Sequence, residues 1–236
     1  GDGQLAVRDS FVRVNGGPQV NLYLHVGDIA YNSALEPELT DYVFSIYPEI
    51  LRTTNIWPTY GNHDGYGSDA VTQTGPWFDA FDTPDGAEAG GVRSYREDWY
   101  SFSYGNAHFI SLNSYDADRL ASGEMRRWLA SDLEVAAEDG AEWIVAYWHH
   151  PPYSKGTHDS DTEIELVEMR ESILPVLEAG GVDLVLTGHS HTYERSYLLD
   201  GAYETPSTKE GALVRTHGDP WLGEAYWKPE GLSARS

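Results

Sequence analysis

Residues 182–195 read VDLVLTGHSHTYER and hold the most informative pattern in the chain. The apolar run at 182–186 leads into Gly188, a pattern that is typical of a buried strand. His189 and His191 follow at a spacing of two, so both imidazoles point to one side if the backbone stays extended. Two such imidazoles provide half of a metal site, although two histidines in a polar loop explain this pair equally well.

The composition is that of a folded and strongly acidic protein. Its 236 residues are 40% hydrophobic and 13% aromatic, which is enough for a sizeable core, and we expect one domain over residues 1–236. The formal net charge of −23 predicts that neither nucleic acid nor an anionic membrane is a partner. The chain has no cysteine, which excludes disulfides, thiolate metal ligands and a cysteine nucleophile.

Hydrophobic periodicity predicts strands that alternate with helices through most of the chain. We expect strands over 20–26, 56–60, 143–148, 182–186 and 193–199, and helices over 5–14, 36–53, 122–139 and 161–179. A hairpin is expected where 99–104 and 107–112 flank Gly105-Asn106, and 65–96 reads as a long irregular stretch. This order of elements predicts an α/β fold with a mixed sheet or sheets.

Polar clusters follow four of the expected strands, and the carboxyl ends of strands are where α/β sheets bind ligands. These clusters are Gly27-Asp28 with Tyr31, Gly61-Asn62-His63-Asp64, His149-His150 and Gly188-His189-Ser190-His191. Six of the nine histidines lie in or near them, namely His63, His149, His150, His158, His189 and His191. We interpret the remaining three, His25, His108 and His217, as ordinary strand or tail histidines.

Oxygen and imidazole donors without thiolates suit iron, zinc or manganese. Asp28 follows a glycine at a strand end, so it is the natural bridge between two ions held about 3.5–4 Å apart. Tyr31 is close enough along the chain to reach the same ion. A phenol with an ordinary pKa of about 10 binds a metal well only after losing its proton, which a trivalent ion favours. Tyr31 therefore points to ferric iron.

At this point the chain resembles a known family, the calcineurin-type metallophosphoesterases. The motifs that carry the resemblance are Gly27-Asp28-Ile29-Ala30-Tyr31, Gly61-Asn62-His63-Asp64, His149-His150-Pro151-Pro152-Tyr153 and the stretch 188–195. They occur in the family's order, and the Asp-x-x-Tyr and His-x-His-x-Tyr-Glu-Arg elements look specifically like the purple acid phosphatase branch. The resemblance implies a four-layer α/β/β/α sandwich with mixed sheets.

The resemblance also implies a role for each matching residue. The implied metal ligands are Asp28 as a bridge, Tyr31 and His191 on Fe3+, and Asn62, His149 and His189 on a divalent ion, either Zn2+, Mn2+ or Fe2+. His63 would contact the phosphate or the leaving oxygen. His158 falls where such enzymes carry a histidine acid, and His150 would only line the pocket.

One departure from the family concerns an aspartate ligand in an Asp-x-Gly pattern after the first strand. Only Asp2-Gly3 is available for that ligand here, and no apolar strand precedes it. Because 5–14 resembles the helix after this motif, we expect the family's aspartate and first strand upstream, and further strands beyond Pro229. We thus expect a fragment truncated at both ends, and the resemblance implies an extracellular or periplasmic location.

The implied activity is hydrolysis of a small phosphate monoester by a metal-bound hydroxide, as in an acid phosphatase, with His158 or His63 as the proton donor. Phosphodiester or nucleotide hydrolysis on the same fold is an alternative that the residues in 65–96 would decide. A non-catalytic fragment that binds metal or phosphate is another. A metallo-β-lactamase type of zinc site fits poorly, because Thr192-Tyr193-Glu194 follows where an Asp-His pair belongs.

Overall fold

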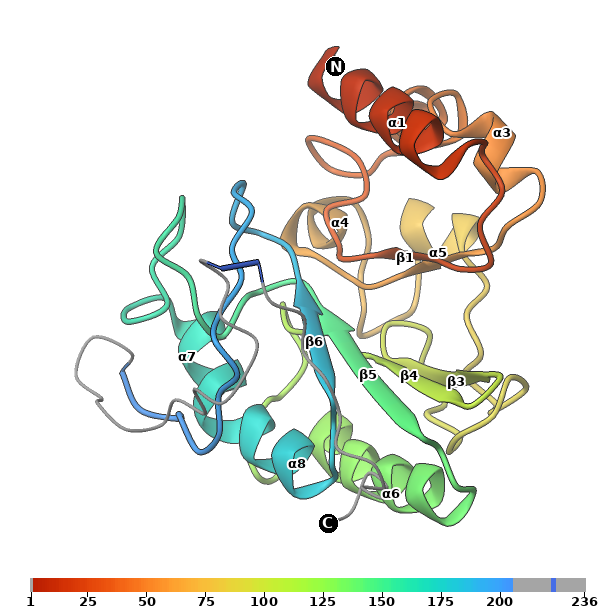
Figure 1. The fold of residues 1–236 in the computed structure, drawn as a ribbon. Helices are drawn as coiled ribbons and strands as arrows, with labels where there is room; N and C mark the ends of the chain where they lie inside the picture. Colours follow the sequence, from red (N-terminus) through yellow and green to blue (C-terminus); the bar gives the residue numbers. More distant parts are fainter. Residues whose placement is uncertain (1, 206–221, 224–236) are drawn as a thin grey trace.

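A computed structural model describes residues 2–205 and 222–223, and its strands form two sheets (Figure 1). In one sheet β1 (Tyr23–His25) and β2 (Ile56–Pro58) pair in parallel, with Tyr23 opposite Ile56. The other has the order β3-β4-β5-β6, comprising Tyr100–Tyr104, Ala107–Ser111, Trp143–Trp148 and Leu184–Thr187. β3 and β4 are antiparallel, whereas β4, β5 and β6 are parallel, which confirms the expected mixed sheet.

Alternating side chains on the strands pack against two different layers. On β5, Ile144 and Ala146 belong to the core beneath the outer helices, whereas Val145 and Tyr147 face the core between the sheets. Trp57 of β2 reaches the same inner core, where it stacks on Phe102 with ring centroids 3.8 Å apart. Successive side chains of a strand point to opposite faces, so each face of the larger sheet packs against a different layer. The two sheets therefore lie face to face, and helices cover the outer face of each.

The helices form the two outer layers of this sandwich (Figure 1). Beside β1 and β2 lie α2 (Glu36–Leu39), the π-helical turn η1 (Thr40–Phe44), α3 (Pro48–Leu51), α4 (Asn62–Gly67) and α5 (Pro76–Ala80). Against the larger sheet lie α6 (Glu124–Glu138), α7 (Ile164–Glu168), η2 (Met169–Ile173) and α8 (Leu174–Ala179). The arrangement confirms the expected α/β class.

The N-terminal helix α1 (Asp2–Asn15) is the helix expected over residues 5–14, begun three residues earlier. Its side chains reach the loop around η1, since Gln4 donates to the carbonyl of Tyr42 and Arg8 to the carbonyl of Ile46, both at 2.8 Å. Among the described residues, no helix is long and apolar enough to cross a membrane.

Several expected elements differ in detail from the structure. The helices expected over 36–53 and 161–179 each consist of two α-helical pieces with a π-helical turn between them. Pro48 is the first residue of α3, and Pro175 is the second residue of α8. Proline lacks the amide proton that continues a helix, so Pro48 starts a new segment and Pro175 lies in the first turn of α8. Residues 65–96 contain α5, and 193–199 form no strand, which corrects both expectations. His217 lies outside the described residues.

The core beneath the outer helices sets a stability prediction. Ile144 is fully buried, so Ile144→Ala leaves a cavity and lowers the free energy of unfolding by about 2–5 kcal/mol. Ile164 is 56% exposed, and Ile164→Ala changes that free energy by only about 0.5 kcal/mol. Urea denaturation of both variants measures the difference, and similar losses would contradict the assignment of Ile144 to the core.

Candidate metal centre

The four polar clusters meet at the carboxyl ends of β1, β2, β5 and β6. A carboxylate oxygen of Asp28, Oδ2, lies 3.0 Å from the Tyr31 hydroxyl and 3.2 Å from Nε2 of His149. The same His149 nitrogen lies 3.1 Å from Oδ1 of Asn62 and 3.1 Å from Nδ1 of His189. Parallel strands place their carboxyl ends at one edge, which brings these distant residues together.

The orientation of His149 is fixed by its other ring nitrogen. Nδ1 lies 2.8 Å from the carbonyl oxygen of Val26, and a carbonyl only accepts, so Nδ1 carries the proton. In the neutral imidazole Nε2 is then an acceptor, and it faces acceptor oxygens of Asp28 and Asn62 at hydrogen-bonding distance. Lone pairs that converge without a proton between them need a cation, so the donor set fits a metal ion.

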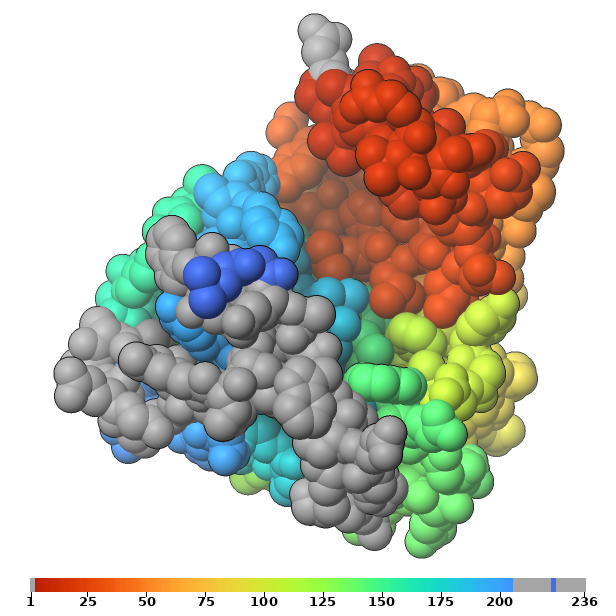
Figure 2. All heavy atoms as spheres, in the orientation of Figure 1, coloured from red at the N-terminus to blue at the C-terminus, as the bar shows by residue number. Residues whose placement is uncertain are grey.

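Tyr31 joins Asp28 to the second half of the cluster. Its hydroxyl donates to Asp28 and lies 2.9 Å from Nε2 of His191. This contact joins the segment after β6 to the N-terminal part of the chain. In Figure 2 these two parts, drawn in blue and red, border a hollow on the visible face. Burial and the charge of Asp28 raise the pKa of Tyr31 above its ordinary value, which keeps the phenol protonated until a cation replaces the proton.

Burial and hydrogen bonding leave one of the two central side chains charged and the other neutral. Burial by itself would raise the pKa of Asp28, but the backbone N–H of His63, which donates to Oδ1 at 2.9 Å, helps to hold that pKa well below its ordinary range, so Asp28 is a carboxylate. Burial lowers the pKa of His189 to about 4, and His149 and His158 add to that effect. His189 is therefore neutral near pH 7, the form of imidazole that binds metals.

A buried carboxylate that the sequence analysis did not single out holds the cluster in place. Asp64 accepts backbone N–H groups of Asp28 at 2.9 Å, Ile29 at 3.1 Å and Gly61 at 2.9 Å. Burial raises the pKa of Asp64 to about 7, against the lowering effect of the Gly61 and Ile29 amides. Its place in Gly-Asn-His-Asp was the available signal, but the sequence does not show which amides it binds.

The remaining histidines lie around the cluster. His63 flanks Tyr31, with ring centroids 4.4 Å apart, and its Nδ1 donates to the carbonyl of Asn32 at 2.6 Å. On the other side the His158 ring lies 3.6 Å from that of His189. His150 is buried beside them, where its Nδ1 lies 2.9 Å from the Ser114 hydroxyl.

Glu163 is a second residue that the sequence analysis missed. Its carboxylate lies 2.7 Å from Nδ1 of His158 and 3.7 Å from Nε2 of His189. It therefore orients both imidazoles from outside the cluster. No sequence pattern links Glu163 to His158 and His189. Glu163 immediately precedes α7, and an acidic residue at the start of a helix is common without any functional role.

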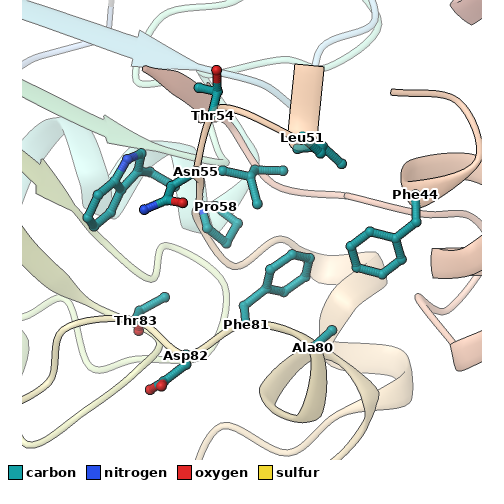
Figure 3. A pocket seen from close by; sticks show the side chains of 11 residues that line it. Phe44, Leu51, Thr54, Asn55, Pro58, Ala80, Phe81, Asp82 and Thr83 are labelled. Atoms are coloured by element: carbon teal, nitrogen blue, oxygen red, sulfur yellow. The ribbon is translucent and has the colours of Figure 1, made fainter. Parts of the chain in front are cut away.

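Asp2, named above in connection with the family's missing aspartate, is the first residue of α1. A separate cavity of about 400 Å3 lies beside β2, and its lining mixes polar and apolar residues (Figure 3). Phe44, Leu51, Pro58 and Phe81 are among its lining residues, and no histidine is. Its lining includes Asn55 and Asp82 but no imidazole, so the histidine-rich polar cluster at the strand ends is the candidate site.

Comparisons with known proteins show the family to which the chain belongs. Residues 1–193 match the sequence pattern of the calcineurin-like phosphoesterases. The chain belongs to the calcineurin-like phosphoesterase family. An uncharacterized protein from Mycobacterium tuberculosis is 30% identical to this phosphoesterase chain over 206 residues, which are 82% of the chain and 38% of that relative. Purple acid phosphatase 18 from Arabidopsis thaliana is 28% identical over 213 residues, 84% of the chain and 46% of that protein.

A solved structure shows the same fold in a distant relative. Purple acid phosphatase PPD1 from yellow lupin seeds matches this phosphoesterase chain with a TM-score of 0.52 at 15% identity, over 78% of the chain and 33% of that structure. The chain thus spans less than half the length of these relatives. The structural likeness confirms the expected metallophosphoesterase fold, and the sequence similarity to purple acid phosphatase 18 confirms the expected resemblance.

The close approach of Gly61 to Asp28 gives a prediction for the site. A Cβ at Gly61 would lie 2.5 Å from both the amide nitrogen and Oδ1 of Asp28. Gly61→Ala therefore pushes the Asp28 loop away and lowers the free energy of unfolding by about 1–3 kcal/mol. Gly3→Ala is the control, because a Cβ there meets nothing within 4 Å. Equal unfolding midpoints in urea would show that Asp28 is not held this closely.

Proposed function

We propose that this chain carries a dinuclear metal centre that hydrolyses phosphate monoesters. The observation that carries the proposal is the position of Asp28, whose Oδ2 contacts both Tyr31 and His149. One carboxylate shared by two donor groups is the arrangement that a pair of ions requires. Membership of the phosphoesterase family and the resemblance to purple acid phosphatases support the same activity.

The donors divide into two groups of different chemistry around Asp28. We assign Tyr31 and His191 to a ferric ion and Asn62, His149 and His189 to a divalent ion, Zn2+, Mn2+ or Fe2+. A phenolate favours the trivalent ion, whereas an amide oxygen and two imidazoles suit a divalent one. When bound, such ions act as Lewis acids and lower the pKa of water.

The protein's own side chains then hold and protonate the ester. His63 and His158 flank the cluster from opposite sides, and we assign one of them to the leaving oxygen as proton donor. Glu163 orients His158, which keeps its Nε2 available for that transfer. The small phosphate ester is a dianion near an acidic chain of net charge −23, so its binding depends on the local positive charge of the ions.

Metal analysis with a visible spectrum tests the ferric assignment. We expect two metal ions per chain and a violet phenolate-to-iron band, which Tyr31→Phe abolishes because it removes the phenolate. Tyr42→Phe is the matched control, since Tyr42 is 42% exposed against 38% for Tyr31. A colourless chain with two zinc or two manganese ions would remove iron from the proposal and leave the esterase activity standing.

Hydrolysis of 4-nitrophenyl phosphate tests the activity itself. His149→Ala should lower kcat/KM by about 100-fold or more, because it removes a proposed ligand, and even outer partners of metal ligands are worth 10–100-fold. The Tyr42→Phe chain should keep its rate. Faster hydrolysis of bis(4-nitrophenyl) phosphate would favour a phosphodiesterase, and retained phosphate without turnover would favour a non-catalytic binder.

A further inference from the structure

A second histidine network lies away from the metal centre, on the helix-facing side of the larger sheet. His108 of β4 is 1% exposed, and its Nε2 lies 2.9 Å from Oδ2 of Asp132 on α6, which is fully buried. Its other nitrogen, Nδ1, lies 3.0 Å from the hydroxyl of Ser103 on β3. Serine, imidazole and carboxylate are thus joined in series, the order of connection found in serine nucleophiles.

Asp132 is held so that its charge acts on the imidazole. Its Oδ1 accepts the Ser101 hydroxyl and the backbone N–H of Val92, both at 2.7 Å. Two donors on Oδ1 leave Oδ2 to accept the Nε2 proton of His108. The neutral imidazole then carries its proton on Nε2 and presents the Nδ1 lone pair to Ser103, which is the tautomer that a general base needs. Relative to chymotrypsin-type triads, the two ring nitrogens have exchanged partners.

Ser103 is the member of the network that solvent reaches. It sits directly opposite His108 in the β3–β4 register, and its own backbone N–H donates to Ala89 at 2.8 Å. The residue is exposed, whereas His108 and Asp132 are buried. A Cβ at Gly90 would lie 3.0 Å from the Ser103 hydroxyl oxygen, so the glycine keeps the space beside that oxygen open.

We propose that Ser103, His108 and Asp132 form a second site, a metal-independent serine nucleophile that reacts with activated esters of small acyl groups. Ser103 and His108 take part in the reaction, and Asp132 is a positioning residue. His108 pairs with Ile144 on β5, and His149 follows that position by five residues, about 16 Å along the strand. The two sites therefore share no residue and use opposite ends of β5.

The reaction balances with the groups present and water. The Ser103 oxygen bonds to the ester carbonyl carbon while its proton passes to Nδ1 of His108. The carbon–oxygen bond to the alcohol then breaks, and the alcohol leaves with that proton. Water releases the acyl group from Ser103 by the same transfers in reverse, which restores the serine and yields the carboxylic acid.

Labelling by a fluorophosphonate probe, with the modified residue located by mass spectrometry, tests the proposal. The Ser103 oxygen attacks phosphorus, fluoride leaves, and His108 takes the proton, so no metal takes part. We expect Ser103 to be labelled at least 10-fold faster than Ser131, an exposed serine on α6 whose hydroxyl bonds only to the carbonyl of Arg127 among its described partners. The rate should be unchanged after treatment with EDTA and in His149→Ala.

Variants of the network separate a reactive role from a purely structural one. Ser103→Ala should abolish the label, and His108→Gln should slow labelling of Ser103 by about 100-fold, within the range of general base catalysis. Asp132→Asn should slow it too, with Asp132→Glu restoring part of the rate. All rates are taken on chains whose circular dichroism shows them folded. Labelling of Ser103 no faster than of Ser131 in the unaltered chain would overturn the proposal.

Discussion

The carboxylate of Asp64 fixes the relation between the two strand ends on which the candidate centre depends. It binds the amides of Asp28, Ile29 and Gly61 at 2.9–3.1 Å, and so ties the loop after β1 to the start of α4. A buried carboxylate costs free energy unless its oxygens are hydrogen-bonded. The loop after β1 and the start of α4 therefore cannot separate without leaving Asp64 exposed or without hydrogen-bond partners. Asp28 and Asn62 consequently face His149 from fixed positions.

The layered packing provides the frame for this geometry. Trp57 and Phe102 stack between the sheets, while Ile144 and Met169 pack beneath the outer helices. A one-residue shift in any strand would exchange these faces, so burial on both sides fixes the register. The register in turn places His149 just beyond the carboxyl end of β5 and His108 beside the opposite end of that strand.

Two histidines of this fold differ because different acceptors hold their protons. The carbonyl of Val26 accepts a hydrogen bond from Nδ1–H of His149, which turns Nε2 toward the acidic and amide oxygens of the metal centre. The carboxylate of Asp132 accepts a hydrogen bond from Nε2–H of His108, which turns Nδ1 toward a hydroxyl. An unprotonated imidazole nitrogen that faces other acceptor atoms can bind a cation together with them, whereas one that faces a hydroxyl can accept its proton and activate the oxygen.

The sequence by itself determined β1 to β6, the hairpin and the polar residues after four of these strands, because hydrophobic periodicity and strand-end chemistry are local properties. It therefore predicted that Asp28, Asn62, His149 and His189 belong together. Only the tertiary structure placed Glu163 beside His158, gave Asp64 its three amides, and joined Ser103 through His108 to Asp132. Those contacts depend on how helices pack on sheets, and the separation of residues along the chain carries no record of that packing.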